Sequence, residues 1–138
     1  MPGDIPSCCL SEHSKPLPPG STIGILGGGQ LGRMLATAAA KLGLRVTVFE
    51  PEAGCPASDV AKSHICASYD DTAALEAFAR TADAITLEFE NVPVTVLQYI
   101  EQLRPVFPSS RALQITQDRI AEKAFVASLG LPVGAYEP

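Results

Sequence analysis

The residues with the clearest chemical potential form a glycine-rich segment, GGGQLG, at positions 27–32. The segment follows an apolar run with β-branched residues and precedes a helical pattern, which is the setting that gives a G-x-G-x-x-G motif its meaning. Glycines let the backbone turn sharply and approach an anion, and free N–H groups at a helix start favour negative charge. The motif predicts a phosphate-binding turn. The alternative is a tight turn that serves only helix–sheet packing.

An acidic residue, Glu50, closes the second expected strand. It lies roughly 20 residues beyond the glycines, where dinucleotide-binding folds place the carboxylate that binds the ribose of NAD. Gln30 and Leu31, in contrast, put a polar amide and a bulky apolar group where the chain crosses the anion, and Pro51 follows Glu50 directly. NAD therefore stays open as a ligand, although these three residues weigh against it.

A second acidic cluster ends a later strand, in the sequence EFENVP at residues 88–93. Alternation along the strand sends Glu88 and Glu90 to the same side. Ligands of open α/β sheets bind at the carboxyl ends of strands, so both carboxylates are expected to face the crevice that the glycine segment lines. There they would contact hydroxyl groups or an amine. The alternative is a solvated loop in which Asn91 caps the helix that starts at Pro93.

A small cationic site is expected near the end of the chain. Arg119 and Lys123 are four residues apart and project from one face of a helix. Asp118 and Glu122 lie beside them and compete for both charges. Such a set of charges usually forms ion pairs on a solvent-exposed helix face.

The cysteine and histidine residues indicate neither a metal site nor a nucleophile. His64 and Cys66 form an H-x-C pair without a second ligand pair at metal spacing, so a buried or edge-strand position is expected for both. The other cysteines are Cys8, Cys9 and Cys55, and no C-x-x-C pair exists. We expect free thiols in a reducing compartment.

Length and composition limit the class of protein. The 138 residues allow one compact domain, with 46% hydrophobic and 18% charged residues, enough to build a core. The net charge of −5 argues against sequence-independent binding to nucleic acid or to anionic membrane. The chain shows no apolar run long enough to span a bilayer and no signal-peptide pattern, so a cytoplasmic location is expected.

The elements that must position these residues alternate between strand and helix. Residues 1–20 hold five prolines and no apolar period, which predicts a flexible leader. The expected strands cover residues 22–26, 45–49, 64–67, 84–87 and 106–107. Short strand-helix-strand connections specify parallel strands, so the prediction is an α/β fold: an open, doubly wound parallel sheet of about five strands with helices on both faces.

Four helices are expected between and after the strands. The first carries an apolar stripe that ends near Gly43 and consists of Leu31, Met34, Leu35, Ala38 and Leu42. The second is capped by Asp70 or Asp71. The third starts at Pro93, and the fourth is a single helix over residues 117–129.

The order and spacing of these motifs resemble one family more specifically than any single motif does. GILGGGQLGRML, VFEP, TLEFENVP, QDRIAEK and a Leu-Gly-Leu-Pro ending follow one another across residues 21–138. Together they are similar to the N-terminal domain of the N5-carboxyaminoimidazole ribonucleotide synthetases, ATP-grasp enzymes of purine biosynthesis. The resemblance implies a Rossmann-like pre-ATP-grasp domain over residues 21–110, and a helical segment over 111–138 that leads into an ATP-grasp domain beyond it.

The resemblance also implies an activity and site residues. The family joins bicarbonate to 5-aminoimidazole ribonucleotide with ATP and Mg²⁺, by way of carboxyphosphate, and works as a homodimer. Its glycine turn meets the ribonucleotide, so the backbone at Gly29, together with Gln30 and Leu31, would line the 5′-phosphate and ribose. Glu88 and Asn91 would reach toward the ribose. Arg119 matches an ATP-contacting arginine, and no role is carried over to Lys123.

Three hypotheses from different classes remain at this point. The first is the substrate-binding part of this ligase, which is expected to be inactive alone because the catalytic lobes and magnesium ligands would follow residue 138. A related ATP-grasp ribonucleotide enzyme, such as formate-dependent glycinamide ribonucleotide transformylase, is the nearest variant. The second is an NAD(P)-binding oxidoreductase domain that depends on Glu50. The third is a fold unit without catalytic function.

Overall fold

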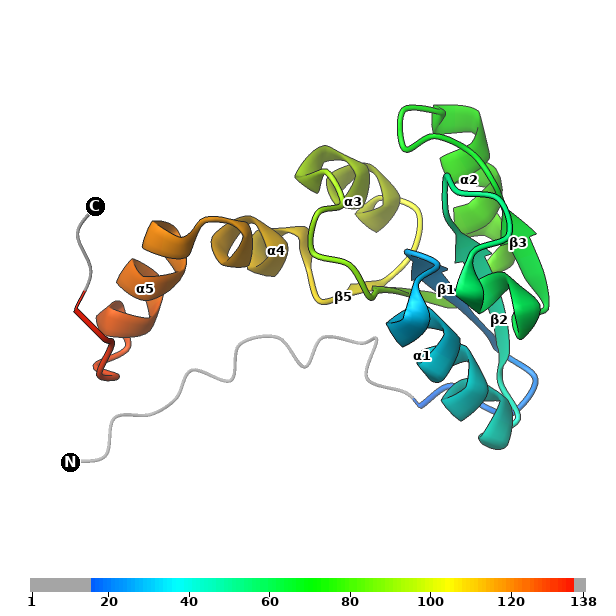
Figure 1. The fold of residues 1–138 in the computed structure, drawn as a ribbon, viewed down its shortest axis with the longest axis horizontal. Helices are drawn as coiled ribbons and strands as arrows, with labels where there is room; N and C mark the ends of the chain where they lie inside the picture. The colour runs from blue at the N-terminus through cyan, green and yellow to red at the C-terminus, as the bar shows by residue number, and fades with distance from the viewer. Residues whose placement is uncertain (1–15, 136–138) are drawn as a thin grey trace.

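A five-stranded parallel sheet with helices on both faces forms the body of the protein (Figure 1). The structure is a computed structural model that describes residues 16–135, so residues 1–15 of the expected leader lie outside the described part. The predicted α/β class is confirmed. In chain order the elements are β1 (Thr22–Leu26), α1 (Gln30–Lys41), β2 (Arg45–Phe49), the 3-10 helix η1 (Pro56–Asp59), β3 (Ser63–Ile65), α2 (Thr72–Thr81), β4 (Ala84–Leu87), α3 (Val94–Glu101), β5 (Val106–Phe107), α4 (Ser110–Gln117) and α5 (Arg119–Ser128).

The strand order places the glycine turn beside the acidic loop. The order is β3-β2-β1-β4-β5, so the chain builds outward from β1 on one side and then returns to β4 on the other. Leu26 pairs with Leu87, and the N–H of Glu88 donates to the carbonyl of Leu26 at 3.1 Å. The segments that follow β1 and β4 therefore leave the sheet side by side, at the switch point where open α/β sheets bind ligands.

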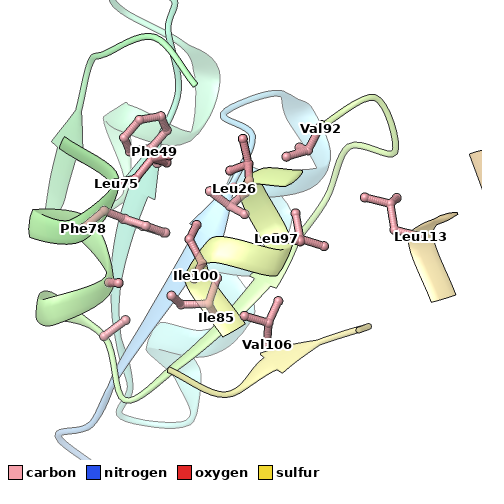
Figure 2. Packing of buried hydrophobic residues seen from close by; sticks show 13 residues of the cluster. Leu26, Phe49, Leu75, Phe78, Ile85, Val92, Leu97, Ile100, Val106 and Leu113 are labelled. Carbon is pink, nitrogen blue, oxygen red and sulfur yellow. The ribbon is translucent and has the colours of Figure 1, made fainter. Parts of the chain in front are cut away.

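Successive strand residues point to opposite faces and build two separate cores. Ile25 and Val48 pack with the buried side of α1, whereas Leu26 and Phe49 pack with α2 and α3 on the other face. Figure 2 shows this second core, in which side chains of α2 and α3 turn toward the sheet. The two cores hold the carboxyl ends of β1, β2 and β4 rigidly, and these are the ends that carry the candidate site.

Helix α1 differs from the expectation that its large apolar residues mark the packed stripe. Gly32, Ala36 and Ala39 form its buried face. Small side chains let the helix lie close to the sheet: a Cβ at Gly32 would stand 3.0 Å from the carbonyl oxygen of Gly27. The residues of the expected stripe are exposed instead, and all of them except Ala38 are too bulky for that approach. They are Leu31, Met34, Leu35, Ala38 and Leu42.

The helix expected over residues 117–129 is present as α5, Arg119–Ser128. A further helix that the sequence did not predict, α4, precedes it, and Asp118 lies in an extended conformation between the two. Ser109 caps α4 by accepting from the N–H of Ala112, and Asp118 caps α5 by accepting from the N–H groups of Ile120 and Ala121. Asp118 therefore ends α4 and starts α5. The periodicity of the apolar residues did not predict this boundary.

Helices α2 and α3 differ in how their first turns are capped. Asp71, rather than Asp70, caps α2 through the N–H of Ala74. The alternative cap at Asn91 is wrong, because Pro93 precedes α3 directly and no side chain caps that helix. Across the described residues no helix has the length and apolar character that crossing a bilayer requires.

Candidate functional site

The candidate site starts at the turn between β1 and α1. Gly27 has a φ of +100°, a conformation that residues with a Cβ rarely adopt, and its N–H donates to the carbonyl of Phe49 at 3.0 Å. A Cβ at this position would also lie 2.9 Å from the side chain of Glu88. Glycine is therefore required here both by the turn and by the closeness of the acidic loop.

Two carboxylates hold the turn from below. The N–H of Gly28 donates to Oε2 of Glu50 at 2.9 Å, and the N–H of Gly29 donates to Oε1 of Glu88 at 2.8 Å. Hydrogen bonds to ionised carboxylates are stronger than neutral ones, so these contacts fix the turn firmly. Both N–H groups are thereby engaged within the protein and are not available to an external anion.

The donors that remain lie in the first turn of α1. The N–H groups of Gln30, Leu31 and Gly32 have no acceptor among the described residues, and Gly29 offers no side-chain cap. The helix is 12 residues long, so its positive end carries an appreciable partial charge. The side chains of Gln30 and Leu31 are exposed beside it. The open end of α1 can thus bind an anion such as a phosphate group.

The loop after β4 supplies polar side chains next to this helix end. Glu88 is half-buried, and its Oε2 has no hydrogen bond within residues 16–135. Glu90 and Asn91 are exposed, and the amide of Asn91 makes no hydrogen bond to the described residues. A ligand with a phosphate on α1 would therefore meet carboxylate and amide groups that can bind hydroxyls or an amine.

Tyr69 lies behind the two carboxylates. Its ring packs against Phe49 with centroids 5.4 Å apart, and its buried hydroxyl has no hydrogen-bond partner among the described residues. Burial, followed by the charges of Glu50 and Glu88, raises the pKa of Tyr69 above its ordinary value. The hydroxyl therefore stays neutral beside two negative groups, which is the less costly state in this environment.

Cys55 packs under the turn. A Cβ at Gly28 would lie 2.4 Å from its sulfur, so the thiol fills the space beneath the backbone. His64, on the edge strand β3, places Nε2 at 3.0 Å from the carbonyl oxygen of Glu50 and at 3.9 Å from Cys55 Sγ. Cys55 and Cys66 are free thiols, and within the described part of the chain no three residues of metal-binding type gather at one point.

Arg119 lies apart from the other predicted site residues. Its side chain is 78% exposed and forms an ion pair with Glu122, while Lys123 donates to the carbonyl of Gly134 at 3.4 Å. Figure 1 shows α5 at the end of the molecule away from α1. The structure therefore places Glu88 against the turn at Gly29, where Gln30 and Leu31 begin α1, and Asn91 follows in the same loop as Glu88. It does not bring Arg119 to this turn.

The sequence did not predict the roles of four residues around the turn and the loop after β4. Glu50 was considered only as a ribose ligand, whereas it binds the turn itself. Cys55, Tyr69 and Gln117 were given no role. Gln117 belongs to the QDR motif, which marks this segment in the sequence. Only the fold shows that its side-chain amide reaches the loop after β4.

Comparison with known proteins places the chain close to ribonucleotide synthetases. The model of the ribonucleotide synthetase preATP-grasp domain matches residues 20–117. N5-carboxyaminoimidazole ribonucleotide synthase of Brucella melitensis is 53% identical over 120 residues, which are 87% of this chain and 33% of that protein. The bifunctional purine synthesis protein purC/E of Dictyostelium discoideum is 47% identical over 121 residues, or 88% of this chain and 12% of that protein.

Solved structures show the same likeness. The ADP complex of the purK N5-carboxyaminoimidazole ribonucleotide synthetase superposes with a TM-score of 0.85 at 42% identity, over 90% of this chain and 33% of that one. The Aspergillus clavatus N5-carboxyaminoimidazole synthase, in complex with ADP and 5-aminoimidazole ribonucleotide, gives a TM-score of 0.77 at 29% identity, over 85% and 31% of the two chains. The present chain spans about a third of the Brucella relative and of both solved chains.

Proposed function

The chain belongs to the ribonucleotide synthetase preATP-grasp domain family, and from this we infer that it is the ribonucleotide-binding part of an ATP-dependent ligase. The ligase would carboxylate 5-aminoimidazole ribonucleotide with bicarbonate in de novo purine biosynthesis. The names of the Brucella and Aspergillus relatives support this substrate. The observation that carries the proposal is the open N-terminus of α1 beside the free carboxylate oxygen of Glu88.

In the proposed complex, α1 binds the 5′-phosphate. The N–H groups of Gln30 and Leu31 donate to phosphate oxygens, and the absence of a side chain at Gly29 leaves room for the ligand. Near the ribose, Oε2 of Glu88 accepts a hydrogen bond, and the side-chain amide of Asn91 can accept one or donate one. The chain thereby orients the ribonucleotide so that its amine faces carboxyphosphate, which ATP and bicarbonate would form in the remainder of the enzyme.

An NAD(P) site is less compatible with the groups around the same turn. The carboxylate that would bind the ribose, Glu50, already accepts from the N–H of Gly28 at 2.9 Å and from the N–H of Glu52 at 3.2 Å. A ribose diol would have to share or displace these bonds, which hold the turn. The relatives named above are ligases, and none of these names refers to a nicotinamide cofactor.

ATP would bind outside the glycine turn. Relatives were solved with ADP, and in the complete enzyme Arg119 would exchange its ion pair with Glu122 for a phosphate of the nucleotide. Magnesium does not fit the described residues, because they contain no group of three potential ligands. Its ligands would belong to the part of the relatives that this chain does not span. We also propose a cytoplasmic homodimer for the complete enzyme, as the resemblance implies.

Isothermal titration of the 138-residue chain with 5-aminoimidazole ribonucleotide tests the proposed site. Glu88→Gln keeps an acceptor for Gly29 but removes the charge, so we expect an affinity about tenfold lower, as for the loss of one charge-assisted hydrogen bond. Glu90→Gln removes the same charge from an exposed neighbour and is the matched control, expected to bind as the parent does. Absence of saturable binding by the parent, or equal affinities for the two variants, would contradict the assignment.

A further inference from the structure

Gln117 joins two segments that are far apart in the sequence. It is the last residue of α4, and its Nε2 donates to the carbonyl oxygens of Glu90 at 2.6 Å and Val92 at 2.9 Å. These partners lie 27 and 25 residues earlier in the chain. Carbonyl oxygens only accept, so the amide must present its NH₂ group to them and both of its donors are used.

The segment that Gln117 binds is the loop of the proposed ribonucleotide site. Residues 88–93 connect β4 to α3 and carry Glu88 and Asn91. Val92 is fully buried and anchors the base of the loop in the core, as Figure 2 shows, whereas the residues around Glu90 are exposed. The amide of Gln117 therefore fixes the exposed part of the loop from the side of α4.

Helix α4 is itself fixed, so Gln117 is a firm support. Leu113 is buried in the same core as Val92, and Ser110 donates its hydroxyl and its N–H to the carboxylate of Glu101 at the end of α3. Beyond Gln117 the chain bends at Asp118, and α5 follows with no buried residue of its own. The direction of α5 is thus set largely by the bend at Asp118. This bend lies one residue from Gln117, whose amide binds the loop after β4.

We propose that Gln117 is a positioning residue that holds loop 88–93 in its ligand-binding conformation and couples occupancy of that loop to the start of α5. The proposal rests on the ribonucleotide site described above. Gln117 touches no ligand itself: it acts through the carbonyl groups of Glu90 and Val92. Because Arg119 begins α5, the coupling links the ribonucleotide site to the helix that carries the proposed ATP contact.

The ligand-free chain tests the positioning role. In ¹H–¹⁵N NMR spectra, Gln117→Glu places a carboxylate against two carbonyl oxygens, so we expect shifted amide resonances and lower order parameters for residues 89–92. Gln117→Ala removes the donors without adding charge and is expected to act in the same direction. Gln114, an exposed glutamine on the same helix without a hydrogen bond to the described residues, provides the matched controls Gln114→Glu and Gln114→Ala. A loop that is equally ordered in all four variants would overturn the proposal.

Titration with 5-aminoimidazole ribonucleotide tests the coupling. In the parent and in both Gln114 variants, saturable shifts are expected in residues 30–32 and also in residues 118–122. In the Gln117 variants we expect a dissociation constant about tenfold higher, equivalent to about 1.4 kcal/mol, and no shifts at 118–122. Shifts confined to residues 30–32 in the parent would refute the coupling. Absence of any ligand-induced shift would refute the proposed function instead, while the ligand-free spectra would still decide the role of Gln117.

Discussion

The carboxylate of Glu88 accepts a hydrogen bond from the backbone N–H of Gly29 at 2.8 Å, across 59 residues of sequence. Glu88 therefore helps to shape the glycine turn through Oε1, while its Oε2 has no hydrogen bond among the described residues. A second carboxylate, Glu50, supports the neighbouring N–H in the same way. In the proposed complex, phosphate binding at this turn would thus depend on the first helical N–H groups of α1 rather than on the glycines themselves.

The space under the turn predicts that Gly28→Ala destabilises the fold. The new Cβ would stand 2.4 Å from Cys55 Sγ and 2.9 Å from the Cβ of Glu50, so the backbone or the thiol must move. Overpacking of this kind costs about 1–3 kcal/mol, which urea unfolding can measure. Gly134→Ala is the control, because a Cβ there meets nothing within 4 Å.

The same crowding predicts a coupling with the thiol. In a Cys55→Ala background the sulfur is gone, so the effect of Gly28→Ala on the free energy of unfolding should be smaller than in the parent. Equal effects in both backgrounds would show that Cys55 does not limit the space at Gly28.

Tyr69 is expected to make the stability of the fold depend on pH in the alkaline range. Its hydroxyl ionises near pH 10 in the unfolded chain, whereas burial and two glutamates raise its pKa in the folded chain. Well below pH 10 the hydroxyl is protonated in both the folded and the unfolded chain, so its titration does not change the free energy of unfolding. Above pH 10 the folded state binds more protons, so the free energy of unfolding falls by up to about 1.4 kcal/mol per pH unit. Tyr69→Phe should remove this dependence in urea unfolding between pH 9 and 11.

At neutral pH the same variant is expected to be as stable as the parent or more stable, because it removes a buried hydroxyl that lacks a partner. Tyr99→Phe is the control: Tyr99 is also half-buried, but its hydroxyl is not among the buried unpartnered groups. If Tyr69→Phe followed the parent's pH curve, the environment assigned to Tyr69 would be wrong.

The sequence predicted most of the sheet, because strand signals are local. β1, β2, β4 and β5 have the expected bounds, and β3 differs by one residue at its start and two at its end. The glycine turn and the acidic loop also meet as expected, since parallel strands bring their carboxyl ends to one edge. These features follow from the order of the strands and helices and from the periodicity of the apolar residues.

Other features depend on contacts that periodicity does not contain. The packed side of α1 is set by how closely a backbone can approach the sheet, so Gly32 and Ala36 replace the larger residues at that interface. The break at Asp118 depends on one cap that competes with helix continuation. The support of the turn by Glu50 and Glu88 needs the three-dimensional register of β1, β2 and β4.

Asp118 is predicted to start α5. Asp118→Ala removes the acceptor for the N–H groups of Ile120 and Ala121, and a lost cap costs about 1 kcal/mol. Because α5 has no buried residues to compensate, its first turn should lose helicity, visible in backbone chemical shifts. Asp118→Asn retains a capping side chain and should keep the helix. Equal helicity in both variants would assign the stability of α5 to other contacts.

Arg119 is predicted to act on ATP in the complete enzyme. Arg119→Ala should raise the KM for ATP more than that for the ribonucleotide, by about tenfold to a hundredfold, since one charge-assisted contact is lost. The 138-residue chain should fold unchanged with this substitution, because the side chain is exposed. An unchanged dependence on ATP would reduce Arg119 to the ion pair that it forms with Glu122.

We expect the open end of α1 to bind a ribonucleotide phosphate, and the groups around the glycine turn not to bind a dinucleotide. Parallel ¹H–¹⁵N NMR titrations of the 138-residue chain with 5-aminoimidazole ribonucleotide and with NADH test both expectations together. We expect saturable shifts of the Gln30, Leu31 and Gly32 amides with the ribonucleotide and no saturable shifts with NADH. Saturable binding of NADH that Glu50→Ala abolishes, with no response to the ribonucleotide, would contradict both expectations.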